Sequence, residues 1–302
     1  MEVIYMRIIR YLSEDSKPVL AALTSEETVY PLEQEGFIEL IHQANAQKIS
    51  PLSFVQNMIS KSKPIPQSIE ELSLLVPIIA QEVWASGVTY ERSRDARNYE
   101  ATDGKLDATT FYDKVYDAER PEIFFKSTAA RTVGPNQEVY IRSDSKWQIP
   151  EPELGLIISQ EGEILGYTIG NDMSCRDIEG ENPLYLPQAK MWKHSCSIGP
   201  AILLTESVKD PYDFDIICRI YRHGNLAVEG TASTRQLKRK FEELVSFLVR
   251  DNEIFDGTVL LTGTCIVPPN DFTLLEGDQI EIEIPSIGIL KNSVRLPSEI
   301  SV

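Results

Sequence analysis

Three acidic side chains near the middle of the chain have the types and spacing of a metal site. Glu151 and Glu153 alternate at the start of an apolar run that predicts a half-buried strand, so both carboxylates leave one face. Asp172 closes the next apolar run. Like charges this close cannot all stay ionised without protons or a cation. Three oxygen donors without a neighbouring His or Cys favour a hard ion, Mg²⁺ or Mn²⁺, with positions left for water and substrate.

The third carboxylate depends on how the two strands pair. Residues 160–163, Gln-Glu-Gly-Glu, are typical of a tight turn, and residues 164–169 predict the returning strand. A two-residue loop at 161–162 would place Glu151 directly opposite Asp172, whereas a slip of one residue would separate them. The alternative interpretation is a solvated strand start with Asp172 as a loop cap.

Three other segments carry groups that could act beside such a site. Lys190 could hold a substrate carboxylate or stabilise an enolate, or it could be an ordinary exposed lysine. Glu122 stands at the mouth of an apolar strand, where a raised pKa would suit a proton-abstracting base; a simple strand-edge charge is the alternative. Residues 262–264, Thr-Gly-Thr, could grip a carboxylate or form only a turn.

Composition limits the class of protein. The 302 residues are 42% hydrophobic and 25% charged, as in an ordinary soluble protein. A net charge of −17 without a basic block argues against a nucleic-acid or anionic-membrane partner. The four cysteines are scattered, which indicates reduced thiols, and we find neither a signal peptide nor an apolar stretch long enough to span a bilayer. We therefore expect a cytoplasmic protein.

Short β-like runs separated by Gly, Pro, Asn and Asp make up most of the chain. Regular alternation of strand and helix is missing, which favours a mixed or antiparallel sheet over a doubly wound fold. A proline-interrupted polar stretch at 61–67 is the best linker candidate. The predicted strands are 3–11, 19–22, 123–126, 138–141, 154–159, 201–204, 215–221, 259–262 and 279–284.

Two helices are expected. One covers residues 35–47. The other has an apolar stripe at helical spacing between Leu237 and Leu248, with Ser233 or Thr234 as its cap and Lys238–Lys240 on a solvated face.

Taken together, these segments resemble the fumarylacetoacetate hydrolase family from about Gly87 to Asn292. The resemblance rests on an ordered set of motifs: Glu151-Pro152-Glu153, residues 166–172 (Gly-Tyr-Thr-Ile-Gly-Asn-Asp), Arg176-Asp177, Ala189-Lys190, Gly199-Pro200, Thr262-Gly263-Thr264 and Gly277-Asp278. It implies an α+β fold, with a mixed β-roll catalytic domain over residues 76–302 behind a small N-terminal α/β domain, 1–75. It also implies Mg²⁺ on Glu151, Glu153 and Asp172, and a homodimer or homotetramer.

One departure bears on the chemistry. Hydrolases of the family carry an Asn-Tyr-x-x-His-x-x-Glu segment whose His and Glu activate water. At the matching positions this chain has Ser93 and Ala96. Without that pair, hydrolysis of a C–C bond is not expected.

Further details, among them Phe124-Phe125-Lys126-Ser127-Thr128 and residues 179–188, resemble the branch that dehydrates 2-dehydro-3-deoxy-D-arabinonate or xylonate to 2,5-dioxopentanoate. The resemblance implies a lyase in which the metal acidifies the C3 hydrogen of a 2-keto acid. We assign proton abstraction to Glu122 and the enolate or the leaving hydroxyl to Lys190, although these roles could be exchanged. Ser93, Arg94 and Thr264 are candidates for substrate contacts. The alternatives are an acylpyruvate hydrolase or oxaloacetate decarboxylase, and a non-catalytic sugar-acid-binding protein.

Overall fold

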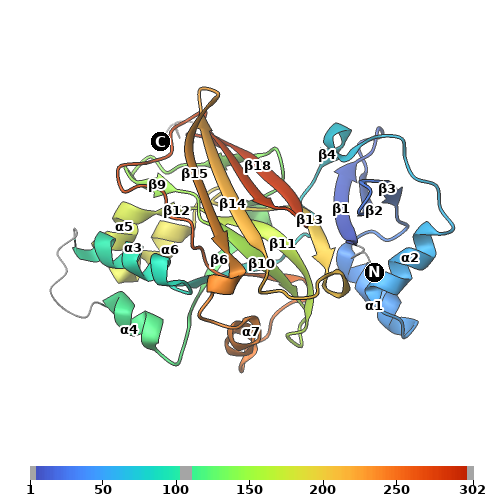
Figure 1. Cartoon of the computed structure of the whole chain (residues 1–302), viewed down its shortest axis with the longest axis horizontal. Helices are drawn as coiled ribbons and strands as arrows, with labels where there is room; N and C mark the ends of the chain where they lie inside the picture. The colour runs from blue at the N-terminus through green and yellow to red at the C-terminus, as the bar shows by residue number, and fades with distance from the viewer. Residues whose placement is uncertain (1–4, 103–110, 298–302) are drawn as a thin grey trace.

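The computed structural model describes residues 5–102 and 111–297, and it has two main β-sheets with helices at their borders (Figure 1). The helices are α1 Phe37–Ala46, α2 Pro51–Ile59, α3 Glu91–Thr102, α4 Phe111–Asp117, α5 Arg176–Glu181, α6 Leu186–Lys190 and α7 Phe241–Val249. The strands are β1 Arg7–Leu12, β2 Pro18–Leu23, β3 Val29–Pro31, β4 Ser73–Leu74, β5 Glu82–Gly87, β6 Glu122–Thr128, β7 Thr132–Val133, β8 Glu138–Tyr140, β9 Gln148–Ile149, β10 Pro152–Ile158, β11 Ile164–Asp172, β12 Ser174–Cys175, β13 Cys196–Leu204, β14 Asp215–Arg222, β15 Asn225–Ser233, β16 Thr258–Leu261, β17 Gln279–Ile284 and β18 Gly288–Arg295.

The larger sheet is mixed, as the sequence predicts. Its path is β3-β2-β1-β13-β11-β10-β16-β5-β6, with β4 and β7 attached at its sides. Most pairs are antiparallel, whereas β16 runs parallel to β5. The strands β10 and β11 therefore lie in the middle of the sheet, where both faces are covered.

Both faces of β10 are buried because each meets a different apolar layer. Leu154, Leu156 and Ile158 belong to the core shared with the second sheet, β15-β14-β17-β18-β8. Ile157 belongs to the core shared with the helices α1 and α2. A strand enclosed on two sides is apolar almost throughout, so the carboxylate of Glu153 on β10 is an exception that needs a partner.

The hairpin between β10 and β11 differs from the predicted two-residue loop. Ser159 N donates to Glu163 O at 2.9 Å, which leaves three residues, 160–162, in the loop; Gly162 has a φ of 83°. Leu165, two residues after Glu163, is unpaired, because Ile158 pairs with Ile164 and Ile157 with Gly166. This β-bulge restores the pairing register that the sequence predicts. The predicted loop is wrong, but the register at the far end of the hairpin is the predicted one.

The predicted cap of the last helix is also wrong. Ser233 caps a separate 3₁₀ turn, Thr234–Gln236, and α7 begins only at Phe241, with Lys240 at its N-cap position. Arg239 is buried rather than solvated, because it pairs with Glu243 and donates to the carbonyl oxygens of Ala118 and Glu119. The apolar stripe of α7 does face the core, as predicted.

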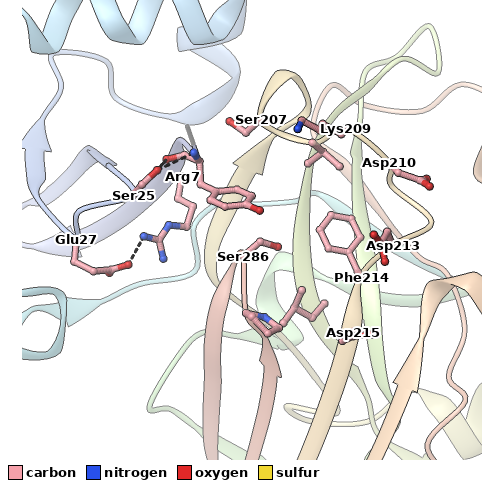
Figure 2. A pocket seen from close by; sticks show the side chains of 14 residues that line it. Arg7, Ser25, Glu27, Ser207, Lys209, Asp210, Asp213, Phe214, Asp215 and Ser286 are labelled. Atoms are coloured by element: carbon pink, nitrogen blue, oxygen red, sulfur yellow. Dashed lines mark hydrogen bonds and ion pairs between the residues drawn. The ribbon is translucent and has the colours of Figure 1, made fainter. Parts of the chain in front are cut away.

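The N-terminal elements continue the large sheet, since β1 pairs with β13. The division of the chain at residue 75 therefore stays a prediction. A cavity of about 470 Å³ lies between this region and the second sheet, and the ion pair between Arg7 and Glu27 borders it (Figure 2). Within the described part of the chain, no helix is long and apolar enough to cross a membrane.

Replacing Gly166 by Ala should destabilise the fold by about 1–3 kcal/mol. A Cβ there would lie 2.5 Å from Ile202 Cγ2 and 3.0 Å from the backbone oxygen of Leu203, where β11 meets β13. Urea unfolding would measure the loss. Gly36→Ala is the matched control, because nothing lies within 4 Å of that Cβ position. Equal stabilities of the two variants would contradict this account of the packing.

Candidate active site

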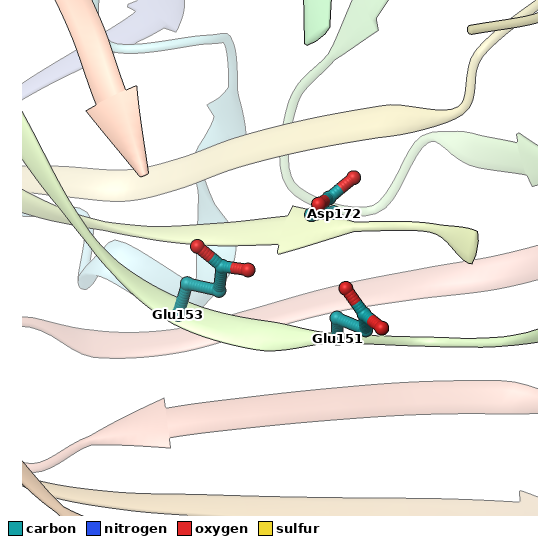
Figure 3. Close-up of side chains that lie close together, drawn as sticks. All are labelled: Glu151, Glu153 and Asp172. Atoms are coloured by element: carbon teal, nitrogen blue, oxygen red, sulfur yellow. The ribbon is translucent and has the colours of Figure 1, made fainter. Parts of the chain in front are cut away.

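The three predicted metal ligands meet at one end of the β10–β11 hairpin (Figure 3). Glu151 directly precedes β10, Glu153 lies within it, and Asp172 ends β11. Asp172 N donates to Glu151 O at 2.9 Å, which confirms that these two residues stand opposite each other. One carboxylate oxygen from each residue lies within 4.8 Å of the others, and all three side chains are buried. The interpretation as a solvated strand start is wrong.

Two buried lysines face these carboxylates. Lys190 Nζ donates to Glu151 Oε2 at 2.5 Å and to Asp172 Oδ2 at 3.0 Å. Lys126 Nζ pairs with Asp172 Oδ1 at 2.6 Å and donates to Met173 O at 2.8 Å. Both lysines are 0% exposed, so the interpretation of Lys190 as an exposed lysine is wrong.

The lysines compensate the three carboxylates unequally. Burial opposes charge on Asp172, but the ammonium groups of Lys126 and Lys190 outweigh it and lower the pKa of Asp172. Burial raises the pKa of Glu153 well above its ordinary value, and the charges of Asp172 and Glu151 raise it further. The Gly263 N–H donates to Glu153 Oε2 at 2.6 Å and opposes this shift only in part. Glu153 is therefore the carboxylate that most lacks a cation.

The donor set fits a hard divalent ion. All three ligands offer carboxylate oxygen, they converge in a buried place, and the pKa of Glu151 is raised as well, by burial despite the attraction of Lys190. Mg²⁺ and Mn²⁺ prefer such oxygen donors. The residues that would hold the ion are Glu151, Glu153 and Asp172.

A second set of buried charges surrounds the first. Arg176 donates to Glu151 Oε1 at 3.2 Å. Arg97 on α3 pairs with Glu179 on α5, and Ser174 Oγ donates to the other oxygen of Glu179 at 2.9 Å. Our sequence reasoning gave no role to Arg97 or Glu179. The sequence did contain an indication of Arg97. It follows the candidate Ser93 by four residues, which places both side chains on one face of a helix.

Lys126 was another residue without an assigned role. It is the extra residue of a β-bulge between β5 and β6, since Val83 pairs with Ser127 and Trp84 with Phe125. Bulges near active sites redirect side chains. A lysine inside the apolar stretch of residues 123–126 was the signal in the sequence.

Glu122 begins β6 beside this cluster. Its side chain is half-buried, but Oε2 is buried and has no hydrogen-bond partner among the described residues. Burial raises the pKa of Glu122, while the charge of Arg97 opposes the increase. A carboxylate with a raised pKa and an unpaired oxygen has the properties of a proton-abstracting base.

The predicted substrate contacts divide into two groups. Ser93 and Thr264 line a cavity beside the three carboxylates, whereas Arg94 does not: its guanidinium group pairs with Glu91, Asp95 and Asp113. The cavity is lined by Ser86, Gly87, Val88, Ser93, Arg97, Phe124, Glu151, Glu153, Asp172, Arg176, Lys190 and Thr264.

The stabilisation of the protein by Mg²⁺ should grow as the pH rises. The pKa of Glu153 lies well above its ordinary value of 4.5 in the metal-free fold, so a proton competes with the metal at low pH and leaves as the pH rises. Thermal unfolding with Mg²⁺ and with EDTA, from about pH 5 to about pH 8, would measure the difference. Glu153→Gln should weaken this pH dependence, and the part that remains would come from Glu151, whose pKa is also raised. A difference that shrinks with rising pH would contradict the competition.

Replacing Lys126 by Met should destabilise the fold by about 3–5 kcal/mol, because Asp172 would lose a buried partner. Chemical denaturation would measure this. Lys291→Met is the control, since Lys291 pairs with Glu281 at an exposed position and should cost under about 1 kcal/mol. Similar losses in both variants would show that Lys126 does not compensate Asp172.

The chain is similar to several known proteins. The 2-dehydro-3-deoxy-D-arabinonate dehydratase of Saccharolobus solfataricus is 47% identical over 227 residues, 75% of this chain and 76% of that protein. A probable 2-keto-3-deoxyxylonate dehydratase of Haloferax volcanii is 42% identical over 258 residues, 85% and 87% of the two chains. A solved 2-keto-3-deoxy-D-arabinonate dehydratase complexed with magnesium and 2,5-dioxopentanoate is 35% identical with a TM-score of 0.80, covering 98% of this chain and 100% of the other. The family model described as fumarylacetoacetate (FAA) hydrolase C-terminal matches residues 93–295, and the chain belongs to that family.

Proposed function

We propose that the protein is a Mg²⁺-dependent hydro-lyase that converts a 2-keto-3-deoxy pentonate, derived from arabinonate or xylonate, to 2,5-dioxopentanoate. The observation that carries the proposal is the presence of two kinds of carboxylate close together, one lining the cavity and the other paired with Gly87 in its wall. Glu151, Glu153 and Asp172 converge as a ligand set, while Glu122 stands apart with an unpaired oxygen. The names of the dehydratase relatives support the same reaction and substrate class.

The protonation states support a division of roles between Glu122 and Lys190. Burial opposes charge on Lys190, but Asp172 and Glu151 outweigh it and raise the pKa of the lysine, so its ammonium group stays protonated. A protonated lysine donates protons and does not remove them. Glu122 is then the base that takes the C3 proton, and Lys190 supplies a proton to the C4 hydroxyl, which leaves as water.

A Mg²⁺ ion on the three carboxylates supplies Lewis-acid stabilisation of the negative charge that develops on the 2-keto oxygen. Ser93 and Thr264 line the cavity and offer hydroxyl groups to the substrate. Arg94 is not part of this proposal, because it does not line the cavity; Arg97 and Arg176 do, and they are the arginines available to a substrate carboxylate.

Hydrolysis of an acylpyruvate is less well supported. Ser93 occupies the position of the water-activating histidine and is buried, with its hydroxyl donating to Tyr90 O at 2.8 Å. A serine engaged in this way is a poor general base. The family resemblance also supports a homodimer or homotetramer. The four scattered cysteines support a location in the reducing cytoplasm.

Glu122→Gln should lower the turnover of 2-dehydro-3-deoxy-pentonate by about 10²–10⁴-fold, because the amide cannot accept the C3 proton. Mg²⁺ affinity should stay within about twofold, since Glu122 is not a ligand in this proposal. A coupled aldehyde dehydrogenase assay for 2,5-dioxopentanoate would measure turnover. Glu161→Gln, in the exposed hairpin loop, is the control.

Several outcomes would contradict the proposal. Undiminished turnover by the Glu122→Gln variant would remove Glu122 as the base. Cleavage of acylpyruvates or oxaloacetate by the wild-type protein, without dehydration of the sugar acid, would favour the other activities of the family. Binding of the sugar acid without any product would favour a non-catalytic binding protein.

A further inference from the structure

The residue opposite Glu122 has no side chain. Gly87 ends β5 and pairs with Glu122 at the start of β6. Directly opposed residues on antiparallel strands carry their side chains on the same face, about 4.5–5.5 Å apart at Cβ. Gly87 also lines the cavity. A side chain at residue 87 would therefore occupy the same region as the carboxylate of Glu122.

The space is fully used by the carboxylate. A Cβ built on Gly87 would lie 2.0 Å from Glu122 Oε2, 2.5 Å from its Cδ and 3.2 Å from its Cγ. The first two separations are far shorter than any non-bonded contact between these atoms. The Glu122 carboxylate thus lies where the methyl group of an alanine would be.

The backbone at Gly87 does not itself require glycine. Gly87 is not among the glycines with positive φ, so its conformation is open to an alanine. The first obstacle to a side chain is Glu122, because the three nearest atoms all belong to that residue. An alanine would therefore act on this carboxylate before any other neighbour.

Within the part of the chain that the structure describes, the position of Glu122 Oε2 is determined by packing and not by a hydrogen bond. Among the described residues, no group hydrogen-bonds Glu122 Oε2, although the atom is buried. The metal ligands differ in this respect, since Glu151 and Asp172 are fixed by Lys190, and Glu153 by the Gly263 amide. Displacing the carboxylate of Glu122 would break none of these contacts.

We propose that Gly87 is a positioning residue for catalysis: its missing side chain forms the recess in which the Glu122 carboxylate lies within reach of the substrate. This rests on the proposed function, in which Glu122 removes the C3 proton. The role is geometric. A misplacement of a reacting group by about 1 Å costs on the order of 100-fold in rate.

The test is Gly87→Ala, compared with Gly36→Ala. We expect kcat for dehydration to fall about 100-fold in the first variant, with KM and Mg²⁺ affinity within about threefold of wild type. The exchange of C3 hydrogen for deuterium in the bound 2-keto acid should slow by the same factor, because it reports proton abstraction directly. Unchanged kcat and exchange would overturn the proposal.

A second comparison separates positioning from a general structural effect. In a Glu122→Asp variant the carboxyl carbon takes the place of Cγ, 3.2 Å from the Cβ position of residue 87, so an alanine there meets much milder crowding than the 2.0 Å and 2.5 Å of the wild-type carboxylate. We therefore expect Gly87→Ala to cost under about threefold in the Glu122→Asp background, against about 100-fold in wild type. Equal losses in both backgrounds would show that Gly87 acts through the fold, and would overturn the proposal.

The two levels of inference fail in different ways. If Glu122→Gln retains turnover, the assignment of the base is wrong and Gly87 loses its role with it. If Glu122→Gln abolishes turnover while Gly87→Ala leaves kcat and deuterium exchange intact, only the role of Gly87 is wrong.

Discussion

Placing three carboxylates side by side in the interior of a β-sheet is the constraint on which most of this structure depends. Each is buried, and the repulsion between them has to be offset within a few ångströms. Lys126 and Lys190 offset it at Asp172 and on one side of Glu151, and Arg176 reaches the other side of Glu151. Glu153 is left with a backbone amide, so a divalent cation bound by the three carboxylates would complete the site.

The elements around the site follow from these demands. A β-bulge turns Lys126 from its strand toward Asp172, and the short helix α6 ends with Lys190 between two carboxylates. The turn after β16 places the Gly263 amide on Glu153, and Gly263 has a φ of 96°, which glycine adopts easily. Much of the irregular backbone near the cavity thus places a lysine or an amide group against the buried carboxylates.

Most of the fold class and the convergence of the three carboxylates could be predicted from the sequence, because alternation within a strand is a local property. The predicted pairing of Glu151 with Asp172 is correct, although the predicted loop is not. The loop is one residue longer than expected, and the unpaired Leu165 in the bulge restores the original register. Sequence spacing cannot reveal such a cancellation. Arg94 was placed in the site and Arg97 overlooked, because that choice depends on which face of α3 meets α5.

The walls of the site come from segments that are far apart in the chain, and this has a consequence for how the protein folds. Gly263 and Glu153 are 110 positions apart, and the hydrogen bond from Thr89 to Thr262 spans 173. Closing such long loops is slow, because the chain loses conformational entropy before the contacts between the distant segments stabilise it. During synthesis the hairpin of β10 and β11 leaves the ribosome before β16 does. The three carboxylates are therefore made before the strand and the Gly263 turn that cover them in the folded protein. Metal binding by the enclosed site would therefore come late in folding, after β16 has joined the sheet.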